Sequence, residues 1–358
     1  MENTNNHSRW REGQRAEGKA LWQGNSLERE EQHWRINLSK EELNEVEQAL
    51  HHARSSGFEN VTDMTDDPSG FPLQALAVKL SSIGEQLKDG PGFAVLSGLP
   101  IAKYKNHELA IILRGISSYL GVCVSQNYRG DLVGQVIDRS DEIPDPRLYE
   151  AGGEFRMHID PIDIVGLMCV RKARQGGESK IVSALAVHNA LLDERPDLMP
   201  ILYDGFYLFR PHPDRGDTAA LTAEKVPFFA RDREGDFSSY FLPDPVIQTV
   251  DRNFVTLSET EREALDYVEK IAARDELVLS MQLVPGDIQF LNNRTVLHSR
   301  AAYEDFPEKE CRRLMLRIWL MNSQWPRRSS RQQFFDHSHR VGGGIVPQTM
   351  EYSEGLIK

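Results

Sequence analysis

Cysteine, positive charge and long apolar runs are all scarce in this sequence, and each scarcity excludes a class of protein. The 358 residues contain three widely spaced cysteines, Cys123, Cys169 and Cys311, and no CxxC pair. We therefore expect neither a disulfide framework nor a cysteine-based zinc site. Because no signal-peptide pattern or long apolar run is visible either, the sequence predicts a cytoplasmic protein that binds no membrane.

Basic residues are outnumbered by acidic ones, 42 Lys and Arg against 54 Asp and Glu, which gives a formal net charge of -12. That balance argues against a nucleic-acid partner or a membrane surface. It leaves room for a locally basic pocket that binds a small anion. The hydrophobic share of 40% is ordinary for a globular protein.

One domain accounts for most of the chain. Residues 1–33 are polar, charged and poor in aliphatic side chains, so we expect a flexible segment there, with a docking arm as the alternative. Residues 34–330 contain no internal repeat, low-complexity tract or linker and are predicted to form a single domain. Residues 331–358 form the expected C-terminal tail.

Helices are predicted first and short strands later. Ser39 and Glu42 form a capping box at the start of one helix, and apolar spacing predicts two more over 73–87 and 106–120. Further on, helices are expected at 184–193 and 259–273. Runs rich in β-branched and aromatic residues predict strands at 93–96, 133–138, 164–170, 179–184, 206–209, 277–283, 287–291 and 314–321. This pattern predicts an α+β fold with a mainly β core, a jelly-roll-like double sheet with flanking helices.

Three residues form a candidate metal site. In His158-Ile159-Asp160, a strand would place both polar side chains on one face, because side chains alternate with a period of two. His298 supplies a third ligand from a remote strand. Two histidines and one carboxylate are the facial ligand set of non-haem Fe(II) oxygenases. Asp163 falls on the opposite face and is not expected to take part.

Two arginines lie on an otherwise apolar strand that follows this histidine. The period of two places Arg313, Met315, Arg317 and Trp319 on one face of the strand and four aliphatic residues on the other. A buried guanidinium is costly without a partner, so we expect a carboxylate ligand held by bidentate hydrogen bonds.

Together these motifs resemble the taurine and 2,4-dichlorophenoxyacetate dioxygenase (TauD/TfdA) family, whose members are Fe(II)- and 2-oxoglutarate-dependent oxygenases with a double-stranded β-helix core. The resemblance covers roughly residues 90–325 and includes Gly176-Gly177-Glu178-Ser179, which is similar to a turn of the family. It implies that His158, Asp160 and His298 bind iron and carry catalysis. It also implies that Arg313 and Ser179 hold the distal carboxylate of 2-oxoglutarate.

The resemblance implies hydroxylation of an unactivated C–H bond, with O₂ consumed and succinate and CO₂ released. The substrate would be a small or medium-sized amino acid, organic acid or specialised-metabolite intermediate. Arg317 would meet an anionic group of it, and Gln135 and Asn127 are further candidate substrate residues, each with a structural role as the alternative. The segment between His298 and the arginines is a few residues longer than in the taurine enzyme. It therefore stays open which of Arg313 and Arg317 binds 2-oxoglutarate and which meets the substrate.

Other interpretations remain open. The same oxidant can desaturate or cyclise a substrate, and a cupin-like protein could hold Zn²⁺ or Ni²⁺ with the same triad without oxygenase chemistry. A ligand-binding scaffold is a further alternative, and the resemblance is compatible with a homo-oligomer.

The aromatic-rich stretch 211–245 is predicted to be a lid or part of the core. His188 is expected to be structural, His212 is an open candidate for the pocket, and His337 and His339 are not expected to be ligands.

Overall fold

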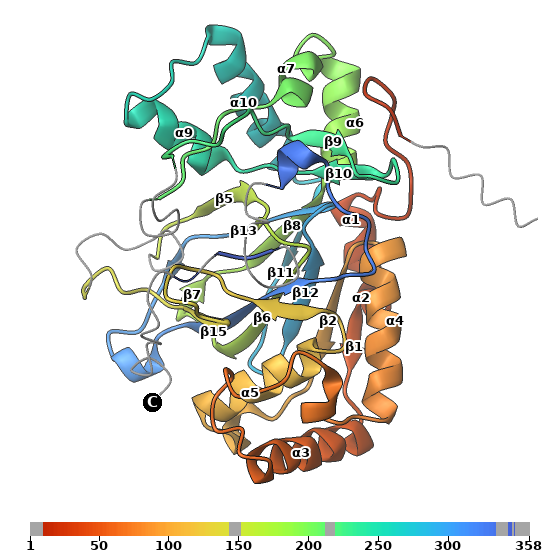
Figure 1. The fold of residues 1–358 in the computed structure, drawn as a ribbon, viewed down its shortest axis with the longest axis vertical. Coiled ribbons are helices and arrows are strands. Elements are labelled where there is room, and N and C mark those ends of the chain that lie inside the picture. The colour runs from red at the N-terminus through yellow and green to blue at the C-terminus, as the bar shows by residue number, and fades with distance from the viewer. Residues whose placement is uncertain (1–9, 143–151, 212–218, 334–342, 346, 348–358) are drawn as a thin grey trace, which may run out of the picture.

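The computed structural model describes residues 10–142, 152–211, 219–333, 343–345 and 347, and Figure 1 shows two β-sheets with helices on either side of them. It is a mixed α/β arrangement. Within the described ranges, no helix combines the length and the apolar character needed to cross a membrane.

The larger sheet has seven strands in the order β1-β2-β12-β6-β15-β3, with β4 alongside β15. Only β1 and β2 run parallel, and the other neighbours are antiparallel. The strands are β1 (Arg35–Asn37), β2 (Phe93–Ser97), β3 (Val122–Val124), β4 (Val133–Val136), β6 (Ile164–Arg171), β12 (Ile288–Asn292) and β15 (Leu314–Met321).

The smaller sheet has four antiparallel strands in the order β11-β8-β13-β5. These are β5 (Phe155–His158), β8 (Ser179–Ser183), β11 (Val278–Met281) and β13 (Val296–Arg300). A shared apolar core joins the two sheets, with Val165 and Met315 from the larger one and Ile181 and Leu279 from the smaller one. The active-site candidates therefore lie on strands that face each other across this core.

Three helices cover the outer face of the larger sheet: α3 (Lys40–Ser55), α4 (Ala75–Asp89) and α5 (Asn106–Ser117) (Figure 1). The predicted capping box of α3 is present, since Ser39 and Glu42 exchange side-chain and backbone hydrogen bonds. Leu316 and Ile318 of β15 pack among these helices, whereas Met315 packs between the sheets. The predicted alternation of β15 is confirmed.

A second helical group lies beyond the smaller sheet and comprises α6 (Ala184–Glu194), α7 (Met199–Asp204), α9 (Pro243–Asp251) and α10 (Glu259–Ala272). It packs with the hairpin β9 (Phe229–Arg231) and β10 (Phe237–Ser239). Phe228, Phe229 and Phe241 are fully buried there, so the aromatic residues of 211–245 form core rather than a lid. The predicted strand 206–209 is wrong, because Phe206 and Phe209 form only isolated bridges.

Residues 10–34, here called the N-terminal arm, pack on the domain, which favours the docking arm over the flexible segment; residues 1–9 lie outside the described residues. The arm contains α1 (Gly24–Leu27), η1 (Glu28–Glu30) and α2 (Glu31–Trp34). Its three tryptophans, Trp10, Trp22 and Trp34, are each less than 9% exposed. Trp22 Nε1 donates to the Pro91 carbonyl at 2.8 Å, and Ala16 exchanges two backbone hydrogen bonds with the Asn189 side chain.

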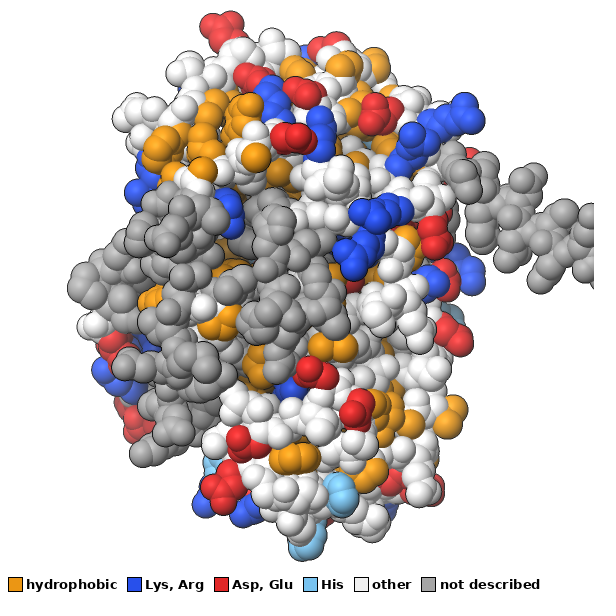
Figure 2. Space-filling view, viewed as in Figure 1, with side chains coloured by type: hydrophobic (Ala, Val, Ile, Leu, Met, Phe, Trp, Pro, Cys, Tyr) orange, Lys and Arg blue, Asp and Glu red, His pale blue; other side chains and the backbone are white. Residues whose placement is uncertain are grey.

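The remaining elements are short. β7 (Gln175–Gly176) pairs with β14 (Tyr303–Glu304), and 3-10 turns form η2 (Pro68–Gly70), η3 (Ile101–Lys103), η5 (Lys309–Cys311) and η6 (Ser330–Gln332). Gln332 is 1% exposed and donates to the Pro227 carbonyl, so the beginning of the predicted tail packs on the domain. Figure 2 shows acidic and basic side chains interspersed on the described part of one face.

Candidate active site

The candidate active site begins where two strands of the smaller sheet lie side by side. β5 ends at His158, and the antiparallel register places this residue opposite His298 of β13. The centroids of the two imidazole rings are 4.3 Å apart. Asp160 follows β5 and is 5% exposed. The candidate ligand atoms of the three residues lie within 4.8 Å of one another, and among the described residues no other group of acidic, His and Cys side chains does so.

Both imidazoles are held neutral. His158 Nδ1 lies 2.7 Å from the Arg156 carbonyl oxygen, which can only accept, so Nδ1 carries the proton and Nε2 keeps its lone pair. Burial lowers the pKa of His158 despite the nearby carboxylate of Asp160. Burial, followed by repulsion from His158, lowers the pKa of His298 to about 3. A neutral imidazole is the form that binds a metal ion.

The Asp160 carboxylate is held from several sides. Its Oδ2 accepts a 2.9 Å hydrogen bond from the indole of Trp319, and its Oδ1 lies 3.5 Å from Arg317 Nη1. Its backbone N–H donates to Asn293 Oδ1 at 3.1 Å. Burial by itself would raise the pKa of Asp160, but the charge of Arg317 and the indole hydrogen bond help to bring the pKa below its ordinary value. The carboxylate is therefore ionised at neutral pH.

These donors fit an Fe(II) ion. Two neutral imidazoles and one carboxylate on one side of a site leave further coordination positions open, as non-haem iron oxygenases require. His298 Nδ1 is buried and has no hydrogen-bond partner among the described residues. An unpaired buried nitrogen is costly in a protein interior, and a metal ligand has a use for such a lone pair.

A cavity beside the triad brings together residues that are far apart in the sequence. His158, His298, Ser179, Arg313 and Arg317 line it, together with Ser299, Arg300 and the apolar side chains of Val136, Phe155, Leu167, Leu283 and Met315. The predicted iron ligands and both predicted arginines thus meet at one site. The arginine side chains would attract an anionic ligand into this cavity, and the apolar side chains would exclude water from it.

Arg313 has the features of a carboxylate partner. It is 8% exposed, burial lowers its pKa, and its Nη1 has no hydrogen-bond partner among the described residues. The predicted Gly-Gly turn lies against it: Gly176 and Gly177 have φ of 75° and 76°, and a Cβ at Gly177 would come 3.3 Å from Arg313 Nε. Ser179, just after the turn, donates to Gln289 Oε1 at 3.0 Å.

Arg317 is more firmly engaged with the protein. Its Nε donates to Gln126 Oε1 at 2.8 Å, and Gln126 Nε2 donates back to the Arg317 carbonyl at 2.8 Å. Gly134, opposite Arg317 in the β4–β15 register, leaves space for this amide, since a Cβ there would come 3.1 Å from Gln126 Oε1. The guanidinium also stacks on Trp319, 5.1 Å from the ring centroid. Arg317 is therefore fixed close to Asp160.

Residues 59–319 match the model of the taurine catabolism dioxygenase TauD, TfdA family. The chain belongs to this family. As a TauD/TfdA member it is an Fe(II)- and 2-oxoglutarate-dependent oxygenase, which confirms the enzyme class and the cofactors predicted from the sequence.

Two other proteins are similar in sequence to this TauD/TfdA member over most of its length. FR-33289 synthase of Streptomyces rubellomurinus is 30% identical over 313 residues, which cover 85% of this chain and 89% of that protein. Taurine hydroxylase-like protein SAT17 of Stachybotrys chartarum is 28% identical over 274 residues, 72% of this chain and 68% of that protein.

Solved structures share the fold. An asparagine oxygenase in complex with Fe(II), a hydroxyasparagine and succinate has a TM-score of 0.65 at 17% identity and covers 87% of this chain and 99% of its own. The non-haem iron oxygenase OrfP, in complex with Fe and alpha-ketoglutaric acid, has a TM-score of 0.58 at 16% identity and covers 80% of this chain and 93% of its own. At such identities the likeness speaks for the fold alone.

Two predicted substrate residues do not line the cavity of this TauD/TfdA member. Gln135 shares a face of β4 with Val133, which packs against the outer helices, whereas Val136 on the other face lines the cavity. Gln135 accepts a hydrogen bond from Arg139 instead. Asn127 is buried and bonds to Asp131 and to backbone N–H groups of its own turn. These contacts favour the structural role, which was the alternative for both residues.

The remaining polar candidates lie away from the triad. Asp163 is buried and paired with Arg294 at 2.7 Å, which agrees with its prediction as a non-ligand. His188 is fully buried on α6, bonded to Tyr203 and Asn189, and is structural as predicted. His212, His337 and His339 lie outside the described residues.

Sequence reasoning missed Arg300 and Tyr303. Arg300 is 9% exposed, lines the cavity, and donates to the Gly153 carbonyl at 2.6 Å. Its guanidinium lies 4.8 Å from the Tyr303 ring centroid, and that of Arg313 lies 5.2 Å from the same ring. The period-two alternation from His298 already places Arg300 on the ligand face, so this signal was available. No pattern marks Tyr303, which lies in the longer segment after the strand.

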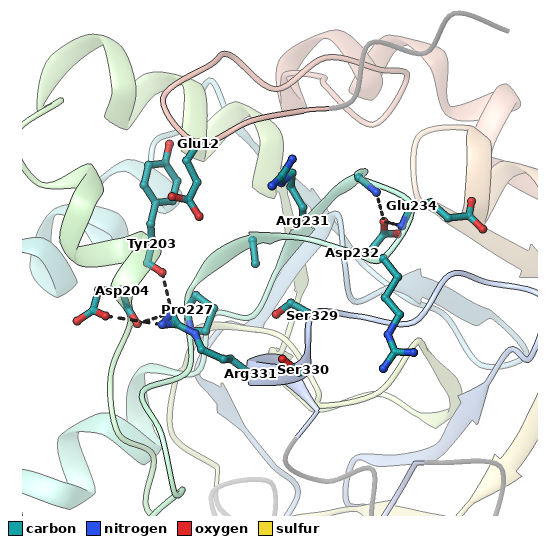
Figure 3. A pocket seen from close by; sticks show the side chains of 13 residues that line it. Glu12, Tyr203, Asp204, Pro227, Arg231, Asp232, Glu234, Ser329, Ser330 and Arg331 are labelled. Atoms are coloured by element: carbon teal, nitrogen blue, oxygen red, sulfur yellow. Dashed lines mark hydrogen bonds and ion pairs between the residues drawn. The ribbon is translucent and has the colours of Figure 1, made fainter.

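A larger hollow of about 710 Å³ lies elsewhere, between the N-terminal arm, α7 and the β9–β10 hairpin (Figure 3). Its charged side chains are of both signs. Arg331 donates to the carbonyl oxygens of Tyr203 and Asp204 there, and Asp232 accepts from backbone N–H groups of its own turn. These contacts stabilise the surface. The smaller cavity beside the triad is the one with converging ligand atoms.

Proposed function

We propose that His158, Asp160 and His298 bind one Fe(II) ion and that the adjoining cavity binds 2-oxoglutarate and a substrate whose C–H bond is hydroxylated. The observation that carries this proposal is that the three ligand side chains lie close together and that two of them, His158 and His298, line the same cavity as Arg313. A hydrolytic zinc site or a scaffold would have no use for the buried, unpaired Nη1 of Arg313.

The two arginines are assigned different partners. Arg313 and Ser179 would hold the distal carboxylate of 2-oxoglutarate, because Arg313 lies against the Gly176-Gly177 turn and keeps an Nη1 without a protein partner. Arg317 would face the substrate, because it lines the cavity while its Nε and its carbonyl are fixed by Gln126.

When bound, Fe(II) with 2-oxoglutarate and O₂ supplies the oxidation of the C–H bond, and succinate and CO₂ are the coproducts. The chain contributes position and surroundings. Arg313 and Ser179 would hold one end of the cosubstrate in the cavity that His158 and His298 also line. Leu167, Leu283 and Met315 exclude water from the cavity, which strengthens every charge interaction inside it.

The substrate is proposed to be a small or medium-sized organic molecule with an anionic group. Arg317 supports the anionic group. The asparagine oxygenase is described with a hydroxyasparagine, and OrfP with a hydroxy-L-Arg, so an amino acid or a related organic acid is in keeping with the fold's known ligands.

We also propose a more specific fold, domain boundary and cellular location for this chain. From β4 onwards the strands of the two sheets alternate along the chain, β4, β6, β12 and β15 in one sheet and β5, β8, β11 and β13 in the other, except that β8 and β11 follow one another in the smaller sheet. This order supports a double-stranded β-helix. We propose one such domain over residues 34–330, with the arm packed on it. The free cysteines 123, 169 and 311 suit a reducing cytoplasm, and a homo-oligomer is compatible with the fold.

The test is the stoichiometry of Fe(II) binding. Under anaerobic conditions we expect one Fe(II) per wild-type chain by equilibrium dialysis, and no binding at the same concentration for His298→Ala, because a ligand from the centre of β13 is lost. His52→Ala, a change of an exposed histidine on α3, is the matched control and should bind like wild type. Unchanged binding by His298→Ala would exclude the proposed metal site.

A further inference from the structure

Trp319 stands apart from the other tryptophans by the partner of its indole N–H. Three of them donate to backbone carbonyls: Trp10 to Gln14, Trp22 to Pro91 and Trp34 to Leu27. Trp319 donates to a carboxylate instead, Oδ2 of Asp160, at 2.9 Å. It is 4% exposed and lies in the core between the sheets. A hydrogen bond between a neutral donor and a buried carboxylate is among the stronger ones in proteins.

The position of Trp319 follows from the alternation of β15. Arg317 comes four residues after Arg313, and Trp319 comes two residues after Arg317, so the three side chains share one face of the chain. That face is turned towards the smaller sheet. Arg313 thus lies just before the strand and the indole of Trp319 near its other end, with Arg317 between them. Asp160 meets the last two side chains of this row.

The two oxygens of Asp160 have different surroundings. Oδ2 has the indole N–H at hydrogen-bond distance, whereas Oδ1 has Arg317 Nη1 at 3.5 Å, a long and weak contact. The backbone of Asp160 is fixed separately by Asn293, so rotation of the side chain is the remaining freedom. The indole restricts this rotation, and it does so without adding a positive charge beside a cation site.

We propose that Trp319 is a positioning residue that holds Asp160 so that a single oxygen, Oδ1, is presented to the metal ion. This inference rests on the proposed function, in which Asp160 is an iron ligand. A carboxylate that binds through one oxygen leaves the other coordination positions to the cosubstrate and O₂. Partners that orient a metal ligand typically change the metal affinity by 10- to 100-fold when they are removed.

The test is Trp319→Phe, which keeps an aromatic ring in the core and removes the N–H donor. We expect the Kd for Fe(II), measured anaerobically with Fe(II) alone, to rise about tenfold or more. Trp325→Phe is the matched control, because Trp325 is also buried, with its ring beneath Arg294, and should leave the Kd unchanged. Trp319→Tyr is a second variant, in case the phenylalanine variant does not fold.

A spectroscopic readout separates positioning from mere packing. Co(II) bound in place of Fe(II) has a visible absorption that depends on the arrangement of its ligands. This spectrum should change in Trp319→Phe and stay as in wild type in Trp325→Phe. If wild type binds no Fe(II), the proposed function fails. If wild type binds Fe(II) and the folded Trp319 variants bind it within twofold of wild type, the positioning role of Trp319 is overturned while the metal site stands.

Discussion

At the scale of the residue, the site is built from side chains whose surroundings fix one protonation state and one direction. His158 is oriented by a backbone carbonyl, Asp160 by an indole, and Arg317 by the amide of Gln126. Arg313 and His298 are the exceptions, since Arg313 Nη1 and His298 Nδ1 have no hydrogen-bond partner among the described residues. The unpaired Nη1 of Arg313 and the fixed Nε of Arg317 are the grounds on which we propose different ligands for the two arginines.

The division between the arginines gives the first prediction. Arg313→Ala should raise the Kd for 2-oxoglutarate about 10- to 100-fold, because charged hydrogen bonds to a carboxylate contribute about 1.5–3 kcal/mol. Arg317→Ala should change it by less than about threefold on the same scale. The measurement is an anaerobic titration of the Fe(II)-loaded enzyme with 2-oxoglutarate. Arg312→Ala is the control, since Arg312 pairs with Asp141 on the surface. Equal effects of the two cavity arginines would contradict the division.

His188 gives a prediction for stability against pH. Burial lowers its pKa from 6.5 to about 4, and its neighbours Tyr203, Asn189 and Arg15 leave it neutral in the native state. Above pH 6.5 both states are neutral and stability is complete. Between pH 6.5 and 4 the unfolded chain takes up a proton that the native chain does not, so stability falls by up to about 3 kcal/mol.

The measurement is urea unfolding at several pH values. His188→Phe, whose ring suits the surrounding aromatic side chains Trp10, Phe229 and Phe237, should lose most of this pH dependence. The control His52→Phe, in an exposed position, should keep it. A slope for His188→Phe that matches wild type would show that other groups cause the acid sensitivity.

At the scale of the element, strands with a clear period of two were predictable and the irregular segments were not. β15 follows its predicted alternation, and β5 and β13 bring His158 and His298 together as their motif implies. The position of Gln135 relative to the cavity could not be predicted, because the face of a four-residue strand depends on which neighbour it pairs with. The packing of the N-terminal arm is hard to predict because the segment has few aliphatic residues. Its three tryptophans bury large areas instead.

The arm supplies the prediction at this scale. Trp22→Ala should lower the free energy of unfolding by about 3–5 kcal/mol, because the ring is buried against Phe93 and its N–H bonds to Pro91. Leu21→Ala, a neighbouring residue that is 40% exposed, should change it by less than about 0.5 kcal/mol. Chemical unfolding followed by circular dichroism measures both. An unaffected Trp22→Ala would mean that the arm adds no stability.

At the scale of the whole molecule, two sheets joined by one core hold ligands from distant parts of the chain at a single cavity. Helices pack on the outer face of each sheet, and the cavity lies between the two sheets. The family and the iron chemistry could be predicted because a few residue types at fixed spacing carry them. The identity of the substrate could not, because the cavity walls come from many unrelated positions whose contacts only the fold defines.

The most direct test of the central claim is the visible absorption of the chelate that 2-oxoglutarate forms with Fe(II) on the protein. Under anaerobic conditions, wild type with both Fe(II) and 2-oxoglutarate should develop a weak charge-transfer band that saturates at one equivalent of each. His158→Ala should show none, and Arg313→Ala should need far more 2-oxoglutarate to reach it. Absence of the band in folded wild type, or an undiminished band in His158→Ala, would contradict the claim that this triad and this cavity form the oxygenase site.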